Sequence, residues 1–228
     1  MFHQACPKAA LSSSWSQGEG QIASKHESAF AVAGVIVGLW CDYPDLGDLI
    51  MAHFYTRCPY LVPYYVPQQE GQSEEDYYRA LGYTYTDGVV ENQDKFLKRM
   101  SGFMRLYAAI LQTSPPPRCK KSNPHGINHG WQWLAQVLNL EPRPDITATL
   151  LLDFLEFAGH AMFKAYGQQF QKLLHILCTG YFPKIKKVTP TGSSGPVSRL
   201  EAFLQNAIKS RIIQPPDGVL KTNFWFTS

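Results

Sequence analysis

The chain has 228 residues, of which 45% are hydrophobic and 13% aromatic, with 21 Lys and Arg against 18 Asp and Glu. So much apolar and aromatic material excludes a wholly disordered chain and suffices for one large or two small globular domains. The formal net charge of +3 is too small to mark the whole chain as a nucleic-acid binder.

The N-terminal region is rich in Ser, Gly, Gln and Ala, and residues 1–27 are expected to be a poorly ordered leader without a signal peptide. The longest apolar run, Ala29–Trp40, has 12 residues. A membrane span needs about 20, so we read the run as a buried helix and expect no membrane partner.

The first half of the chain after this leader is predicted to be helical. Ala29–Trp40 is followed by a second helix, for which Asp45 is placed as a cap. Two prolines make residues 58–67 extended or turning. Ser73 and Asp76 then fit a capping box that opens a short helix.

The clearest helix is predicted at 91–112, where large apolar residues recur every three or four positions. Four prolines interrupt residues 113–124. Further helices are predicted over residues 128–138, 145–158, 168–178 and 198–209. Because no region shows a convincing set of alternating strands, the predicted fold is all-α, with antiparallel helix pairs stacked in a curved layer. We treat 28–228 as one helical domain.

Cysteine usage bears on the redox state. The chain has 5 cysteines, an odd number, at wide spacings and with no CxxC pair, so neither a disulfide framework nor a zinc knuckle is expected. The thiols are expected to be reduced, as in an intracellular protein. They are Cys6, Cys41, Cys58, Cys119 and Cys178.

Charge is strongly segregated along the chain. Residues 42–94 hold ten acidic and two basic residues, whereas 95–140 hold seven basic residues and no acidic one. Residues 164–221 form a second basic block. The blocks can form opposite patches, or they can neutralise each other in the fold.

The patterns that point to catalysis or metal binding are weak. His125 and His129 have the i, i+4 spacing of two zinc ligands, but the accompanying Glu of a metalloprotease is missing. Asp153 and Glu156 could be an acid/base pair, although a solvated helix edge is the simpler interpretation. No phosphate-binding glycine loop is present. We therefore predict neither an enzyme nor a metal site.

Four aromatic residues could form a nucleic-acid-binding site. Trp131 and Trp133, with Phe154 and Phe157, could stack nucleic-acid bases. Trp131 and Leu134 share a helix face, however, which favours core packing.

The basic helix is the strongest functional signal. Lys95, Lys98 and Arg99 follow an i, i+3, i+4 pattern, which places three cations on one helix face. Like charges held together repel one another unless an anion binds them. The anion could be a polyphosphorylated small molecule, an RNA backbone or an acidic protein surface. The alternative is that the three cations simply face solvent.

Several long segments resemble the carboxy-terminal domain of the family of the nuclear-pore mRNA-export mediator Gle-one. They are FLKRMSGFMRLYAAILQ (96–112), HGINHGWQWLAQVLNLEP (125–142), DITATLLLDFLEFAGHAMFKAYGQQF (145–170), YPDLGDLIMAHFYTRCPYLVPYY (43–65), EDYYRALGY (75–83) and the ending FWFTS. The resemblance covers roughly residues 28–228 and implies a fold of stacked helix pairs like HEAT repeats.

The resemblance implies a non-enzymatic role at the cytoplasmic face of the nuclear pore, with further presence in the cytoplasm and nucleus. The family domain binds a DEAD-box RNA helicase and stimulates its ATPase cycle during mRNA export. Inositol hexakisphosphate tethers the two proteins, and a small FG-type nucleoporin also binds. Translation initiation and termination factors are further partners to be expected, and direct RNA binding should be weak or absent.

By the same resemblance, the inositol-phosphate pocket is expected where the basic helix lies. The expected ligand-binding residues are Lys98, Arg99, Lys95, Arg57, His53 and Lys184. Charge reversal at Lys98 and Arg99 is expected to weaken the ligand effect and to leave the fold intact. A helical RNA-binding domain, or a nucleoporin-docking scaffold without helicase activation, is the alternative.

Overall fold

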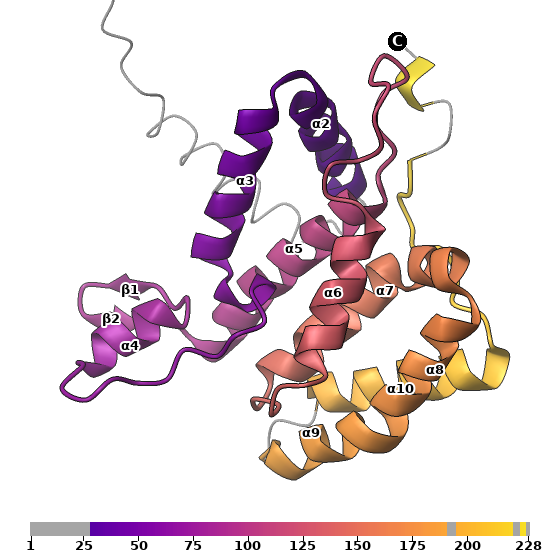
Figure 1. Ribbon diagram of the computed structural model, residues 1–228. Helices are drawn as coiled ribbons and strands as arrows, with labels where there is room; N and C mark the ends of the chain where they lie inside the picture. The colour runs from indigo at the N-terminus through magenta and orange to yellow at the C-terminus, as the bar shows by residue number, and fades with distance from the viewer. Residues whose placement is uncertain (1–27, 191–194, 221–223, 227–228) are drawn as a thin grey trace, which may run out of the picture.

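The computed structural model describes residues 28–190, 195–220 and 224–226, and within them the fold is all-α except for one small hairpin (Figure 1). The predicted leader, residues 1–27, lies outside the described residues. The α-helical prediction is confirmed, and the helices stack in antiparallel pairs.

The first pair consists of α2 (Ser28–Asp42) and α3 (Pro44–Arg57). The helix α2 is apolar almost all round and is buried along most of its length, as the sequence predicted. The two helices cross closely at Gly47, where an added Cβ would lie 2.1 Å from the Trp40 indole. The helix α3 begins at Pro44, one residue before the predicted cap, so Asp45 lies inside the first turn, where a carboxylate still favours the helix dipole.

A small arm follows the first pair. After η1 (Pro59–Leu61), the chain reaches α4 (Glu74–Ala80), whose predicted cap is confirmed: the Ser73 hydroxyl accepts from the Asp76 backbone N–H at 3.1 Å. An antiparallel hairpin of β1 (Tyr85–Thr86) and β2 (Val89–Val90) completes the arm. Sequence patterns missed it because its strands have only two residues each, too few to show alternation.

The central layer consists of α5 (Gln93–Gln112), α6 (Ile127–Val137) and α7 (Ile146–Tyr166). The helix α5 packs against α7 on one side and α2 on the other, and α6 lies across both α5 and α7. Trp133 is 3% exposed, and its ring lies 4.7 Å from that of Phe154, so the core-packing interpretation is confirmed for this pair.

The last layer contains α8 (Gln168–Ile176), the π-turn η2 (Leu177–Tyr181), α9 (Phe182–Val188) and α10 (Gly195–Ser210). The helix α9 was not predicted, because three lysines surround its few apolar residues. The C-terminal η3 (Phe224–Phe226) returns to α2, where Gly38 leaves room for the Trp225 ring.

The helix α7 is long and apolar enough to cross a membrane, with a mean hydropathy of 1.3 over its best window. That window is 78% buried against the rest of the protein. Its composition is therefore explained by its place at the centre of the helical stack.

Asp153 corrects one expectation about this helix. Instead of lying on a solvated edge, Asp153 is 2% exposed and accepts a 2.7 Å hydrogen bond from Arg105 Nε. The reason is that α7 is covered on one side by α5 and on another by α10, so no edge faces water at this position.

Candidate functional site

Five of the six predicted site residues lie on α3 and α5, which meet through Phe54 and through Arg99. Packing of Phe54 against Phe103, whose rings lie 5.7 Å apart and nearly perpendicular, joins the two helices here. The α5 helix starts at this point because the Asn92 side chain accepts from the Asp94 backbone N–H at 2.8 Å. We call the group of residues Lys95, Lys98, Arg99, His53 and Arg57 the cationic face.

Lys95 and Lys98 are the exposed part of the cationic face. Within the described residues, neither ammonium group has an ion pair or a hydrogen bond. By contrast, Lys184 and Lys186 on α9 pair with Glu141 and Glu201. The two α5 ammonium groups are thus available to an added anion.

Arg99 lies differently from the two lysines, because its guanidinium turns inward and binds three internal acceptors. Its Nη2 donates to Glu91 and, at 2.6 Å, to the carbonyl of Gly82, while Nη1 donates to the carbonyl of Arg57 at 3.3 Å. The side chain of Glu91 is only 4% exposed. Arg99 therefore links the end of α3, the turn after α4 and the strand end before α5.

The turn at Gly82 depends on that residue being glycine. Its φ is +91°, and an added Cβ would lie 2.8 Å from Pro59 Cδ. On the other side of Arg99, Tyr83 stacks on Phe96 with ring centroids 3.7 Å apart. These contacts hold the arm against α5 beside the exposed lysines.

His53 and Arg57 share one face of α3, as their spacing predicted, and both are half-buried. Arg57 is the last residue of the helix, where a cation is favoured by the helix dipole. Its backbone carbonyl accepts from Arg99, so the two arginines are brought together.

Lys184 lies apart from this group. It belongs to α9, which packs on η2 and α10, and its ammonium lies 2.8 Å from a Glu141 carboxylate oxygen. Arg99 of α5 thus contacts the Arg57 carbonyl of α3, whereas Lys184 lies on another layer.

Ion pairs join the oppositely charged blocks of the sequence in the fold. Arg99 with Glu91 and Arg118 with Asp42 join the acidic block to the first basic block. Neutralisation between the blocks is therefore real at these positions, although it leaves Lys95 and Lys98 unpaired among the described residues.

The histidine pair at HGINH has a packing role. His125 lies in an aromatic stack, 4.0 Å from the ring of His129 and 5.6 Å from that of Trp40. Burial, reinforced by His129, lowers the pKa of His125 to about 4. In the part of the chain that the structure describes, no three His, Cys, Asp or Glu side chains gather as metal ligands do.

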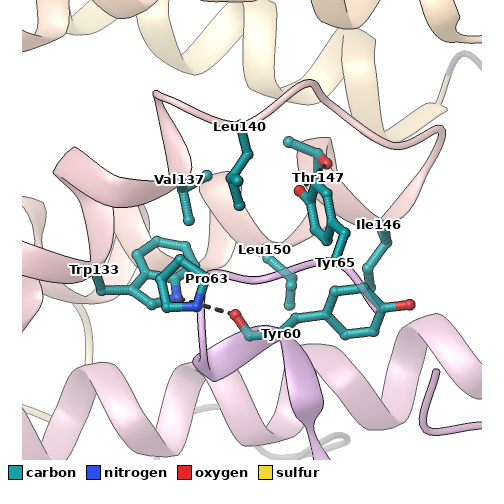
Figure 2. A pocket seen from close by; sticks show the side chains of 9 residues that line it. All are labelled: Tyr60, Pro63, Tyr65, Trp133, Val137, Leu140, Ile146, Thr147 and Leu150. Atoms are coloured by element: carbon teal, nitrogen blue, oxygen red, sulfur yellow. Dashed lines mark hydrogen bonds between the residues drawn. The ribbon is translucent and has the colours of Figure 1, made fainter. Parts of the chain in front are cut away.

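A small apolar pocket lies between the 60–65 segment and the helices α6 and α7 (Figure 2). Trp133 Nε1 donates to the Tyr60 carbonyl at 3.1 Å along one wall, and the Tyr65 and Thr147 hydroxyls lie 3.2 Å apart on another. The free volume of about 10 Å³ is the room of a single water molecule. It is a packing gap, too small for a metabolite.

The model of the GLE1-like protein family matches residues 11–178. The chain belongs to this family. The mouse protein "mRNA export factor GLE1" is 51% identical over 210 residues, which are 92% of this chain and 30% of the mouse protein. The Drosophila melanogaster "mRNA export factor Gle1" is 38% identical over 211 residues, 92% of this chain and 31% of that protein. The chain thus spans about a third of the length of these GLE1 relatives.

The fold is also similar to a solved GLE1-family structure. That structure is a complex of a variant S. cerevisiae Dbp5 C-terminal domain bound to Gle1 and IP6, with a TM-score of 0.76 at 22% identity. The match covers 88% of this chain and 67% of that chain. At this identity it establishes the shared helical fold, in agreement with the predicted stack of helix pairs.

Proposed function

We propose that this chain is the helicase-binding part of an mRNA export factor of the GLE1 family. It binds a DEAD-box RNA helicase of the Dbp5 type and stimulates its ATPase cycle, without catalysing a reaction itself. The observation that carries the proposal is the fold shared over 88% of the chain with a protein solved in complex with Dbp5 and IP6. The names of the relatives support the mRNA-export role.

The proposed tether is inositol hexakisphosphate (IP6), bound on the cationic face. A ligand with about a dozen negative charges needs several converging cations. Lys95 and Lys98 supply exposed ammonium groups, and Arg57 and His53 lie on the neighbouring helix end. Lys184 stays a secondary prediction, because it is paired with Glu141 on another layer.

Arg99 takes a different part in this proposal. Its guanidinium is bound to internal acceptors, so its main contribution is to hold the end of α3 and the arm beside the lysines. Charge reversal at Arg99 should therefore disturb the fold, in contrast to what the sequence alone predicts. Only Lys98, of the two residues, is suited to a charge-reversal test.

Stimulation of an ATPase cycle follows from differential affinity. A partner can shift the helicase between its states only by binding one state more tightly than another. We propose that the domain binds one lobe of the helicase and favours the open state, from which RNA and products leave. A small FG-type nucleoporin and translation factors are further proposed partners, and the cytoplasmic face of the pore is the proposed site of action.

The test is RNA-stimulated ATP turnover by a Dbp5-type helicase, measured with and without the full chain while IP6 is titrated. The proposal predicts that the chain raises turnover and that IP6 strengthens the rise. An unchanged turnover with a folded chain contradicts it. RNA affinity of the chain alone, if it falls steeply with salt, would instead favour the RNA-binding alternative.

A further inference from the structure

Two cysteines far apart in the sequence lie together at the other end of α3 from the cationic face. Cys41 is the penultimate residue of α2, and Cys119 lies in the long loop between α5 and α6. Figure 1 shows the α2–α3 connection and this loop at the same end of the molecule. Cys119 contributes to the raised pKa of the Cys41 thiol, so the two side chains lie near each other, and the Cys119 thiol donates to the Lys121 carbonyl at 3.7 Å.

The residues next to the two cysteines hold this arrangement. Arg118 donates to both carboxylate oxygens of Asp42, at 3.2 Å from Nε and 2.6 Å from Nη2. Asp42 follows Cys41 directly, and Arg118 directly precedes Cys119. The two-bond ion pair therefore sets the two backbone segments side by side at the level of the thiols.

The pair is accessible, in contrast to the core cysteine. Cys41 and Cys119 are both partly exposed, whereas Cys58 is fully buried. Cys178 is also partly exposed, but it lies in the π-turn η2 on the far layer. Cys178 is therefore a matched control for thiol exposure, since no other cysteine among the described residues shares its layer.

We propose that Cys41 and Cys119 form a reversible redox modification site, which low-molecular-weight disulfides such as glutathione disulfide close to an intramolecular disulfide bond. The sequence predicts reduced thiols because it shows no permanent disulfide framework. A disulfide between Cys41 and Cys119 that forms and breaks reversibly is compatible with that prediction. Such pairs, in reducing compartments, are regulatory and form only when the oxidant rises.

The order of the two steps follows from the surroundings of the sulfurs. Burial raises the pKa of the Cys41 thiol to about 12, and Cys119 and Asp42 add to the shift. Cys41 therefore stays protonated at neutral pH, and the proposal places it second in the order of attack.

The attack releases one glutathione thiolate and leaves a mixed disulfide on Cys119. Cys41 then gives up its proton and displaces the second glutathione from that sulfur. The sum is two protein thiols plus glutathione disulfide giving one protein disulfide and two glutathione thiols.

The bridge would restrain most of the first half of the domain. The loop that it closes, 41–119, contains α3, the arm and α5, and hence the whole cationic face. A cross-link of this length restricts the unfolded chain strongly, so the oxidised protein should melt later. For a chain of this size the expected rise in Tm is on the order of 5–10 °C.

The experiment uses the full chain with Cys6→Ser, which removes the thiol outside the described residues. The protein is equilibrated in glutathione buffers of increasing oxidised fraction, quenched with N-ethylmaleimide and digested for mass spectrometry, and its Tm is measured in parallel. The proposal predicts a peptide that links Cys41 to Cys119. It also predicts a rise in Tm that dithiothreitol reverses.

The matched variants separate the proposal from general thiol oxidation. Cys178→Ser should keep both the cross-linked peptide and the rise in Tm, whereas Cys119→Ser and Cys41→Ser should lose both. Glutathione trapped on Cys119 without the cross-link would overturn the proposal. So would a cross-link that forms only between two chains.

Discussion

Replacing Arg99 by Met should destabilise the domain strongly, although the residue looks like one of three equivalent cations in the sequence. The change removes the guanidinium donors to Glu91 and to the Gly82 and Arg57 carbonyls, and it leaves Glu91 with the Thr84 backbone N–H at 2.9 Å. Because the Glu91 side chain is 4% and that of Arg99 13% exposed, water cannot replace the lost partner well.

Removing one partner of a buried ion pair typically costs about 3–5 kcal/mol. At roughly 2–4 °C per kcal/mol for a chain of this size, Tm should fall by roughly 6–20 °C. The assay is thermal unfolding followed by circular dichroism at neutral pH. The double variant Arg99→Met with Glu91→Leu should recover much of the loss, because no charge is then left buried without a partner.

The control for this prediction is Lys98→Met, one residue away on the same helix. Lys98 is exposed and unpaired among the described residues, so its replacement should change Tm by no more than about 2 °C. Equal, small shifts for the Arg99 and Lys98 variants would refute the assignment of Arg99 as an internal link.

Three further predictions concern the core. Arg105→Met and Asp153→Leu should each cost about 3–5 kcal/mol of stability in denaturant unfolding, because each leaves half of a buried pair, while the double variant should be closer to the parent. The pKa of His125 is lowered to about 4 from the usual 6.5, so the unfolded chain binds the additional proton between these values. Stability should therefore fall as pH drops from about 6.5 to 4, by up to roughly 3 kcal/mol, and a His125→Phe variant should show a flatter profile. Gly47→Ala should lower Tm measurably, because the new methyl group meets the Trp40 indole; an unchanged Tm would show that α2 and α3 can move apart.

The helices could be predicted from the sequence because their apolar residues recur with the helical period. Helix α5 is the clearest example, since the large apolar residues that recur every three or four positions from Phe96 to Leu111 are all buried. The Ser73 cap could also be predicted, because it depends only on two residues three positions apart in the sequence. Local patterns suffice where the stabilising contacts are local.

The roles of Arg99 and Asp153 could not be predicted in this way. Arg99 shares a helix face with Lys95 and Lys98 in sequence spacing, yet its acceptors come from the turn after α4 and the end of α3. Asp153 is buried because α5 supplies Arg105 from 48 residues away. The excess of cations in residues 95–140 can be seen in the sequence. Which of these cations form ion pairs depends on tertiary contacts, which the sequence does not show.

In the proposed function, IP6 joins the helicase to this chain through the exposed lysines of α5. The most direct measurement is the Kd between a Dbp5-type helicase and the full chain by calorimetry, with and without IP6. The parent should bind more tightly with IP6, and so should the control double variant Lys120→Gln with Lys121→Gln, which removes two exposed charges from the α5–α6 loop. In the double variant Lys95→Gln with Lys98→Gln, the factor by which IP6 lowers the Kd should fall by roughly 10- to 100-fold. Such a fall is expected for the loss of charge-assisted contacts. An IP6 effect that survives in this variant, or that is lost equally in the control, would contradict the claim.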